Sequence, residues 1–372
     1  MTQFVNGQKF KICLVSISLA KGGAERSCAI LSQMLDQQGH EVHLVILNNE
    51  IDFPFAGRLF NLGAFKKKRD TIWQRITRFK KLRKYLKGHS FDVIIDHRHK
   101  NLYYSELFYD RYVYKNINRI YVVHTSNKNQ NLTSKPGMFV KICNKNLMNV
   151  SVSQYIQKRI LEKSGVKKCM TIYNTFNPGW NKENIEIPLE IENKTYILSY
   201  GRIDDEIKDF TFLIHSFTLS KVWEQNVYLV IMGEGKDKEK LIELASELPC
   251  ASHILFLPFA KSPFPYIASA RFIAVTSRYE GFPMVLTESL SLGTPVVSLD
   301  IISGPSEIIQ HKKNGLLILK REVPLFSEGI KTMCTDNALY ERCKANAKKS
   351  VSEFSMEIIS KKWNKLLQNE LQ

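Results

Sequence analysis

The sequence offers neither a disulfide framework nor a zinc site. Its seven cysteines are odd in number, are scattered along the 372 residues and include no Cys-x-x-Cys pair. Evenly paired cysteines are typical of small secreted proteins, and closely spaced pairs are typical of zinc sites. We therefore expect a protein of a reducing compartment that holds no structural metal.

Long apolar runs are also lacking, since no stretch approaches the roughly 20 residues of a transmembrane helix. The run 12–20 follows Lys9 and Lys11 and resembles a signal-peptide core. It is short, however, and a glycine turn and a charged helix follow it at once, which favours a buried first strand. We expect a cytoplasmic protein, or one that is peripheral on the cytosolic face of a membrane.

The glycine loop Lys21-Gly22-Gly23-Ala24-Glu25 matches neither of two common phosphate-binding signatures. It is not the G-x-G-x-x-G of dinucleotide-binding oxidoreductases, nor is it the P-loop of standard NTPases. Its small residues would let a sugar phosphate or an acceptor approach the backbone. A tight structural turn is the alternative interpretation.

Negative charge is scarce in one half of the chain. Residues 1–190 carry 31 Lys and Arg against 14 Asp and Glu, whereas residues 191–372 carry 22 of each, so the first half holds the whole net charge of +17. Such asymmetry concerns partners rather than fold. It indicates that the first half meets a membrane surface, a phosphorylated acceptor or a nucleic acid.

Eleven of these basic residues lie between Lys66 and Lys87, with a single acid among them. Apolar residues recur through this segment at helical spacing, namely Ile72, Ile76, Phe79, Leu82 and Leu86. The pattern predicts a basic amphipathic helix at a membrane surface. The residues that would face the membrane or the acceptor are Lys80, Lys81, Arg83 and Lys84. An ordinary surface helix with a solvated basic face is the alternative.

Short apolar runs alternate with helical segments in both halves. The expected strands are 11–18, 41–47, 91–96, 119–124, 149–153, 195–200, 228–232, 254–257, 272–276 and 295–299. Within these runs, apolar and polar residues do not alternate. Such runs suit strands buried on both faces, which are typical of parallel sheets flanked by helices. We therefore predict an α/β fold with two doubly wound, Rossmann-like domains that face a cleft.

The predicted domains are an N-terminal domain over 1–175 and a C-terminal domain over 195–352. A polar linker with several proline and glycine breaks joins them over 176–194. The last helix, within 353–372, is a candidate to pack back on the N-terminal domain. Ligands of such folds bind at the carboxyl ends of the strands.

The segment from the strand at 272–276 to Pro295 contains a candidate anion site. Pro283 suits the first position of the following helix, because the N–H that proline lacks has no partner there. The free amides of that first turn would bind a diphosphate, aided by the helix dipole. These amides belong to Gly281, Phe282, Met284 and Val285.

Charged side chains flank this candidate anion site. Glu280 lies before the helix and Glu288 inside it, and carboxylates there suit sugar hydroxyls better than phosphate. The alternatives are a helix-dipole partner for Glu280 and a solvated helix residue for Glu288. Arg202 and Lys208 follow the strand 195–200 and could neutralise a diphosphate as it leaves, or they are ordinary surface bases. His124 ends an apolar strand and is either structural or catalytic.

Together these motifs resemble the retaining GT-B enzymes of glycosyltransferase family 4. The resemblance rests on the Gly-Gly-Ala-Glu loop, on His124, on Gly201-Arg202…Lys208, on Gly233-Glu-Gly235 and on Glu280…Glu288. It covers nearly the whole chain and is strongest from Ser199 to Leu317. The run Ser303-Gly-Pro-Ser-Glu-Ile-Ile resembles the subset that builds bacterial surface polysaccharides and lipid-linked glycans.

The resemblance implies a role for each matching residue. Arg202 and Lys208 would bind the donor diphosphate, Glu288 the ribose and Glu280 the donor sugar. Gly23 would lie against donor or acceptor, and His124 near the donor sugar. The residues expected around sugar and phosphate are Gly281, Phe282, Pro283, Met284 and Val285. The residues expected to act in the reaction are Glu280, His124, Arg202 and Lys208.

The implied reaction moves a hexose or N-acetylhexosamine from a nucleotide-diphosphate sugar, with UDP favoured, to a lipid-linked or polysaccharide acceptor. The leaving phosphate would take the acceptor proton, so no protein nucleophile is needed. Asp209 departs from the family pattern, which usually has Gly or Asn after the lysine. No Asp-x-Asp occurs in the chain, which fits an enzyme that uses no metal and no cofactor.

Three alternatives stay open at this point. A nucleotide-sugar epimerase and a phosphorylase share the predicted fold, although no signal for the cofactor lysine of a phosphorylase is seen. A nucleic-acid-binding protein would explain the basic half, but no recognised binding module is present. We therefore expect a nucleotide sugar, a polyprenyl-diphosphate-linked or glycolipid acceptor and an anionic membrane surface as partners, and no nucleic acid.

Overall fold

The computed structural model describes residues 7–67, 71–127, 132–176 and 191–371. The chain divides into two compact units. Unit 1 comprises Met1–Thr175 and Met356–Gln372, and unit 2 comprises Phe176–Ser355. Of the predicted linker, residues 177–190 lie outside the described part of the chain.

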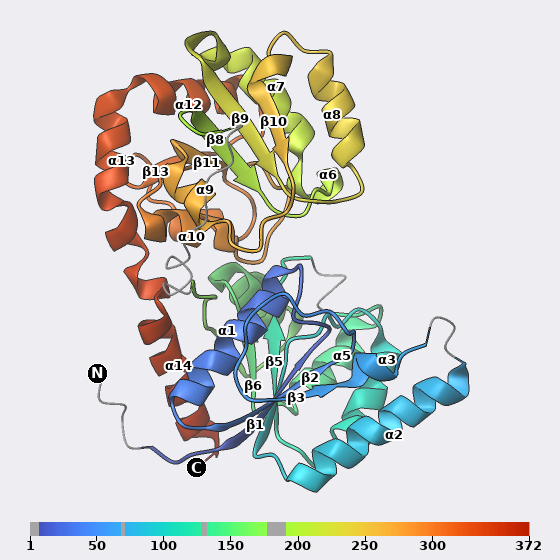
Figure 1. Ribbon diagram of the computed structural model, residues 1–372. Coiled ribbons are helices and arrows are strands. Elements are labelled where there is room, and N and C mark those ends of the chain that lie inside the picture. The colour runs from blue at the N-terminus through green and yellow to red at the C-terminus, as the bar shows by residue number, and fades with distance from the viewer. Residues whose placement is uncertain (1–6, 68–70, 128–131, 177–190, 372) are drawn as a thin grey trace. The chain divides into compact units, whose positions relative to one another are not determined.

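Unit 1 is built on a parallel sheet in the order β3-β2-β1-β4-β5-β6-β7. The strands are β1 Lys11–Ser16, β2 Glu41–Ile46, β3 Arg58–Asn61, β4 Val93–Asp96, β5 Arg119–Val123, β6 Met148–Ser151 and β7 Cys169–Thr171. The central strands are apolar and fully buried, as Leu14, Ile94 and Ile120 illustrate. Burial on both faces follows from helices on both sides of the sheet (Figure 1).

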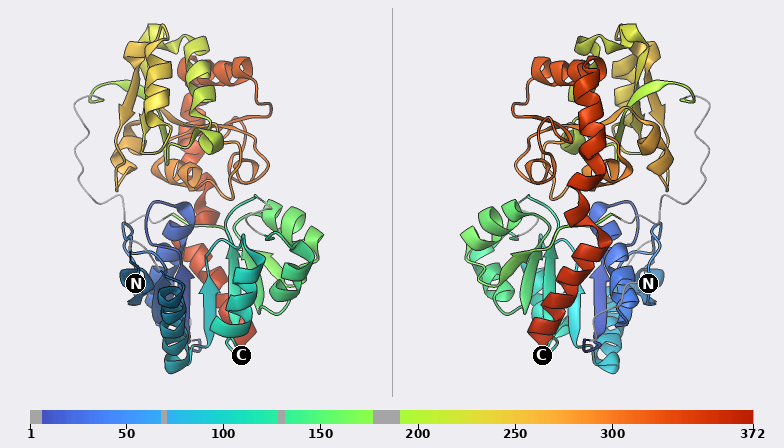
Figure 2. Two further views of the ribbon diagram at one scale, coloured as in Figure 1. Left: turned by 90° about the vertical axis from the view of Figure 1, so that its right-hand side faces the viewer. Right: turned by 90° about the vertical axis from the view of Figure 1, so that its left-hand side faces the viewer.

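The helices of unit 1 come from both ends of the described chain. They include α1 Gly23–Gln37, α2 Ile72–His89, α3 Tyr103–Phe108, α5 Pro136–Cys143 and α14 Met356–Leu371. Helix α14 packs beside α1 (Figures 1 and 2), where the Gln38 side chain donates to the Ser360 backbone oxygen at 2.9 Å. Trp363 and Leu367 of α14 are buried. A segment that follows unit 2 in sequence therefore completes the core of unit 1.

Unit 2 repeats the same plan with a parallel sheet in the order β10-β9-β8-β11-β12-β13. The strands are β8 Thr195–Tyr200, β9 Val227–Met232, β10 Ile254–Leu257, β11 Phe272–Val275, β12 Val296–Leu299 and β13 Gly315–Ile318. The helices include α6 Asp205–Lys208, α7 Phe210–Ser220, α8 Lys238–Ser246, α9 Phe264–Ser269, α10 Met284–Leu292, α11 Pro305–Ile308, α12 Val323–Thr335 and α13 Asn337–Ser350.

Each sheet has a topological switch point, where successive strands turn to opposite sides. In unit 1 it lies between β1 and β4, and in unit 2 it lies between β8 and β11. The loops that leave neighbouring carboxyl ends diverge at such a point, so side chains there can surround a ligand. Most of the predicted site residues follow one of these four strands directly.

Helix α2 is basic, but its apolar residues are not buried along its whole length. The helix begins with a capping box between Thr71 and Gln74. Leu82 and Leu86 are buried, whereas the side chains of the first turn are open to solvent: Ile72 is 73% exposed and Trp73 is 77% exposed. The apolar side chains of the first turn are therefore exposed, and the membrane-surface role of the helix stays a prediction.

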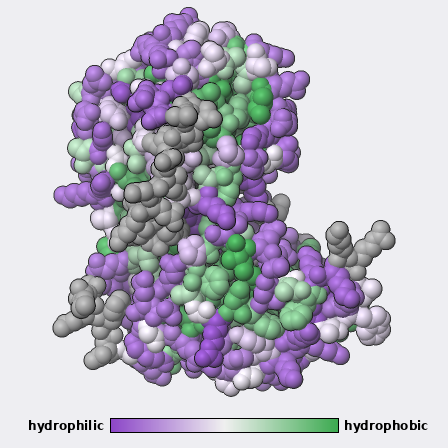
Figure 3. All heavy atoms as spheres, viewed as in Figure 1, coloured by the Kyte–Doolittle hydropathy of each residue, from purple (hydrophilic) through white to green (hydrophobic). Residues whose placement is uncertain are grey.

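Hydrophilic residues cover most of the face drawn in Figure 3 in both units. Within the described ranges, no helix combines the length and the apolar character required to cross a membrane.

Candidate functional site

The switch point of unit 2 brings together two of the predicted donor-site residues. Lys208 lies in the loop and short helix after β8, and Glu280 lies in the loop after the neighbouring strand β11. The Lys208 Nζ donates to Glu280 Oε1 at 2.6 Å, and the Ser277 Oγ donates to the same oxygen at 2.8 Å. Both charged side chains retain some exposure, 23% for Lys208 and 16% for Glu280. A ligand can therefore reach this ion pair.

The loop after β8 depends on glycines that allow two backbone segments to touch. A Cβ atom on Gly233 would lie 1.9 Å from the Gly201 carbonyl oxygen, and one on Gly235 would lie 1.9 Å from that of Ile203. The Ile203 amide donates to the Glu234 carbonyl oxygen at 2.9 Å. These contacts hold the loop that carries Arg202, whose side chain is exposed at the carboxyl edge of β8.

Helix α10 presents its N-terminus beside Glu280. It begins at Met284, so Pro283 is the N-cap residue rather than the first helical residue as predicted. The ψ angle of Pro283 is 92°, which is extended rather than helical. Residues Gly281 to Met284 are buried, and Val285 is partly exposed. The first amides of any helix lack intrahelical acceptors, so this end suits an anion.

A second loop supports the backbone that precedes α10. The Ser303 Oγ donates to the Gly281 carbonyl oxygen at 2.7 Å. Gly304 has a φ of 103°, and a Cβ atom there would lie 2.3 Å from Pro283 Cδ. The Ser303-Gly304 pair that contributed to the family resemblance therefore fixes the position of the Gly281–Pro283 loop.

Glu288 is buried rather than solvated, so the alternative role considered for it is wrong. Its exposed fraction is 1%, and the Tyr200 Oη donates to its Oε2 at 2.7 Å. Tyr200 is the last residue of β8 and was not singled out from the sequence. This hydrogen bond ties the Glu288 carboxylate of α10 to the end of β8, which is the strand that leads to Arg202 and Lys208.

The switch point of unit 1 contains Gly23. Gly22 caps helix α1 in an extended conformation, and Gly23 is the first helical residue. A Cβ atom on Gly23 would meet nothing within 4 Å, whereas one on Gly22 would lie 2.0 Å from the Glu25 carboxylate. Gly23 therefore borders open space at the carboxyl edge of β1, as a substrate-facing residue requires.

His124 follows β5 and pairs with a second histidine that follows β4. The Nδ1 atom of His97 lies 2.9 Å from the Nε2 atom of His124, and the two rings stack with their centroids 5.1 Å apart. Burial lowers the pKa of His97 to about 3 and holds the pKa of His124 well below its ordinary value. Both rings are therefore neutral, and one donates a hydrogen bond to the other.

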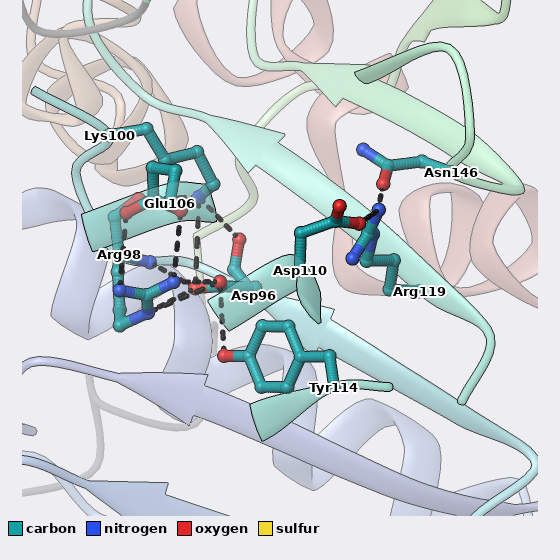
Figure 4. A network of polar contacts seen from close by, with 8 residues as sticks. All are labelled: Asp96, Arg98, Lys100, Glu106, Asp110, Tyr114, Arg119 and Asn146. Carbon is teal, nitrogen blue, oxygen red and sulfur yellow. Dashed lines mark hydrogen bonds and ion pairs between the residues drawn. The ribbon is translucent and has the colours of Figure 1, made fainter. Parts of the chain in front are cut away.

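A buried ionic cluster lies at the carboxyl end of β4, around its last residue, Asp96 (Figure 4). The Arg98 guanidinium lies between Asp96, at 2.7 Å, and Glu106, at 3.2 Å, and Lys100 Nζ donates to the Asp96 backbone oxygen at 3.1 Å. Burial opposes ionisation of Asp96, but Arg98 and Lys100 lower its pKa overall. Tyr114 also donates to the Asp96 carboxylate. The cluster fixes the segment that carries His97.

Two family models match consecutive parts of the chain. The model of Glycosyltransferase Family 4 matches residues 21–180, and the model of Glycosyl transferases group 1 matches residues 181–350.

Curated relatives agree with these matches. The chain is 28% identical to the N-acetylgalactosamine-N,N'-diacetylbacillosaminyl-diphospho-undecaprenol 4-alpha-N-acetylgalactosaminyltransferase of Campylobacter jejuni, over 92% of this chain and 95% of the relative. It is 33% identical to the lipopolysaccharide 1,6-galactosyltransferase of Escherichia coli, over 45% of this chain and 47% of the relative.

Solved structures show the same architecture. Anabaena HepE in complex with UDP-glucose superposes with a TM-score of 0.76 at 19% identity, over 97% of this chain and all of that chain. The pneumococcal O-GlcNAc transferase GtfA in complex with UDP and GlcNAc gives a TM-score of 0.78 at 12% identity, over 98% of this chain and 99% of that one.

Two doubly wound units with polar loops at their switch points, together with these similarities, define the fold as GT-B and the protein as a glycosyltransferase. The chain belongs to the group 1 glycosyltransferases, with an N-terminal half of the family 4 type. The predicted GT-B fold and glycosyltransferase family are thereby confirmed, whereas a retaining reaction stays a prediction.

Proposed function

We propose that the protein is a retaining hexosyltransferase that uses a UDP-sugar and a lipid-linked or polysaccharide acceptor. The observation that carries the donor assignment is the Lys208–Glu280 pair beside the N-terminus of α10. The UDP complexes of HepE and GtfA, which share the fold, support UDP as the donor nucleotide. The name of the Campylobacter relative, which specifies a diphospho-undecaprenol substrate, supports a lipid-linked acceptor.

In this proposal, the donor diphosphate lies at the first turn of α10 and is neutralised by Lys208 and Arg202. Glu280 accepts hydrogen bonds from hydroxyls of the donor sugar, and Glu288 accepts them from the ribose. The Tyr200 hydroxyl holds the Glu288 carboxylate in place for that purpose. Backbone amides and two basic side chains supply the positive charge, so we propose that the reaction needs no metal or other cofactor.

The proposed chemistry uses Lys208 in two states. Without donor, Lys208 pairs with Glu280. A diphosphate brings more negative charge than one carboxylate and draws the ammonium group towards itself, which leaves Glu280 able to accept from the sugar. As the bond between the sugar C1 and the phosphate oxygen breaks, Lys208 and the α10 amides stabilise the charge on the leaving UDP. The acceptor oxygen attacks the same face and gives its proton to that phosphate.

We assign the acceptor to unit 1, where Gly23 and the neutral His124 are the residues that we expect to meet substrate. A lipid-linked acceptor places the enzyme at a membrane surface. Helix α2 supports this assignment, because it carries exposed Ile72 and Trp73 beside basic residues. Lys80, Lys81 and Lys84 are exposed and Arg83 is partly exposed. Lys81 and Arg83 also lie over the rings of Phe65 and Tyr112.

A ligand screen followed by product analysis tests the proposal. Thermal shifts are measured with UDP, GDP, ADP and their sugars, because a ligand that binds only the folded protein raises its melting temperature. The stabilising donor is then incubated with a polyprenyl-diphosphate-linked glycan, and the new anomeric centre is assigned by NMR. We expect stabilisation by UDP and a product that keeps the donor's α configuration. An inverted product would refute retention, and an epimerised donor without acceptor would support the epimerase alternative.

A further inference from the structure

Asp209, the residue that departs from the family pattern, has an unusual backbone conformation. Its φ and ψ angles are 55° and 51°, in the left-handed region, where it ends α6 and precedes α7. Glycine enters this region without strain, and Asn and Asp enter it more readily than other side chains. An aspartate therefore satisfies the backbone requirement of this position and adds a carboxylate to it.

That carboxylate is buried against two arginines. Asp209 is 3% exposed, and its Oδ2 accepts from Arg321 Nη1 at 2.7 Å and lies 3.0 Å from Arg278 Nη2. Arg321 follows β13, and Arg278 lies in the loop after β11. A buried carboxylate is costly without compensation, so this pairing determines whether the turn can form.

Arg321 also binds the loop that leads to Glu280. Its guanidinium donates to the carbonyl oxygens of Thr276, at 3.0 Å, and of Ser277, at 2.5 Å. The Thr276 Oγ1 in turn donates to the carbonyl oxygens of Lys208, at 3.1 Å, and of Asp209, at 3.0 Å. One planar guanidinium thus joins the loop that carries Lys208 to the loop that carries Glu280, a geometry that a lysine ammonium cannot reproduce.

We propose that the Asp209–Arg321 ion pair is a positioning clamp that sets the distance between Lys208 and Glu280 and thereby the affinity for the donor diphosphate. The role of Lys208 in this inference rests on the proposed function. The clamp itself is independent of it, because the contacts join the two loops whatever ligand they bind. Neither Asp209 nor Arg321 is expected to touch substrate, since both act through the backbone of the neighbouring loops.

The test compares Arg321→Met, Arg321→Lys and Asp209→Asn with the control Arg271→Met. Arg271 lies at the opposite end of β11, where it donates to the carbonyl oxygens of Met333 and Cys334. It is therefore an arginine with similar hydrogen bonds, but it does not contact the loops that carry Lys208 and Glu280. Asp209→Asn keeps the tolerance for left-handed φ and removes only the charge.

Affinity for UDP is measured by calorimetry, and donor KM and kcat are measured with the active sugar nucleotide. We expect Arg321→Met and Asp209→Asn each to weaken UDP binding about ten- to a hundredfold, as the loss of a charge-assisted bond implies. Arg321→Lys should fall between these variants and the wild type. The double variant should lose clearly less affinity than the sum of the two single losses, because both single variants break the shared Asp209–Arg321 contact. Arg271→Met should lower only the melting temperature.

Hydrogen exchange of the ligand-free protein tests the clamp independently of the proposed function, because the measurement needs no donor. Residues 203–212 and 276–283 should both exchange faster in Arg321→Met and in Asp209→Asn than in the wild type and in Arg271→Met. Unchanged exchange in these segments would overturn the clamp, as would additive losses in the double variant. A wild type that binds no UDP would overturn the proposed function, while the exchange rates would still decide the clamp.

Discussion

Glu280 and Glu288 are eight residues apart but lie in different surroundings. Glu280 is partly exposed and pairs with Lys208, whereas Glu288 is buried and accepts from Tyr200. A partly exposed carboxylate beside a cation can exchange partners when a ligand arrives. A buried and anchored one offers a fixed acceptor. At the scale of single residues, the proposed function therefore gives the two acids different parts of one donor to bind.

We therefore predict that substitutions of the two acids change different quantities, namely the affinity for UDP and the KM for UDP-sugar. Glu288→Gln should weaken UDP and UDP-sugar alike, by about tenfold or more, because a charge-assisted bond contributes about 1.5–3 kcal/mol. Glu280→Gln should raise the KM for UDP-sugar while leaving the affinity for UDP close to that of the wild type. Calorimetry with both ligands distinguishes them, with Glu239→Gln, at an exposed position of α8, as the control. Equal losses in both variants would refute separate roles.

The His97–His124 pair makes stability depend on pH. The pKa of His97 is about 3 in the folded protein, against an ordinary value of 6.5, because the ring is buried. Between these values the unfolded chain binds a proton that the folded protein does not. The free energy of unfolding should therefore fall as pH drops below about 6.5, by up to about 1.4 kcal/mol per pH unit for this one group.

Urea unfolding between pH 7.5 and 5 measures this dependence. His97→Gln, which keeps a polar side chain but cannot take up a proton, should flatten the curve relative to the wild type. His215→Gln removes an exposed histidine of α7 and should leave the curve unchanged. Identical slopes for the wild type and His97→Gln would contradict the neutral buried pair.

The sequence predicted which residues occupy the ends of central strands, but it could not predict their partners. Lys208 and Glu280 were found separately because each follows an apolar strand. Their contact depends on β8 and β11 being neighbours, which no local pattern shows. Tyr200 and Arg321 were missed for the same reason, since a tyrosine that ends a strand and an arginine on a surface segment become informative only when packing brings a carboxylate to them.

At the scale of elements, the prediction succeeded for the inner strands of each sheet and for the edge strand β10, but it failed for the other three edge strands. The three strands that it missed, β3, β7 and β13, are all edge strands. Central strands are buried on both faces and read as continuous apolar runs, whereas edge strands are short and mixed in composition. β3 has the sequence Arg-Leu-Phe-Asn, and none of its residues is fully buried.

Helix α2 contributes a prediction at the same scale. In the proposed contact with a membrane, the exposed first turn would add hydrocarbon contact to charge. Ile72→Ser and Trp73→Ser should each lower binding to vesicles with anionic lipids by about tenfold, since burying such a side chain contributes about 1.5–3 kcal/mol. Cosedimentation measures this, and Ile242→Ser, at an exposed isoleucine of α8, is the matched control. Equal binding by all variants would show that α2 is an ordinary surface helix.

At the scale of the molecule, unit 1 depends on residues that follow unit 2 in sequence. Trp363 and Leu367 of α14 lie in its core. Trp363→Ala should destabilise unit 1 by about 3–5 kcal/mol, the usual cost of a large cavity. Unit 2 should keep its stability and its response to UDP. Hydrogen exchange measured separately for β1 and β8 would show the effect in β1 alone, and equal acceleration in both strands would contradict this division.

The same feature has a consequence for synthesis. Domains usually fold as units in the order in which the ribosome makes them. Here unit 2 is continuous, but the sheet of unit 1, made first, lacks α14 until residues 356–372 have been translated. Unit 1 must therefore wait with the apolar surface beneath α14 uncovered while unit 2 is made, so the unit whose sheet is made earlier finishes folding later.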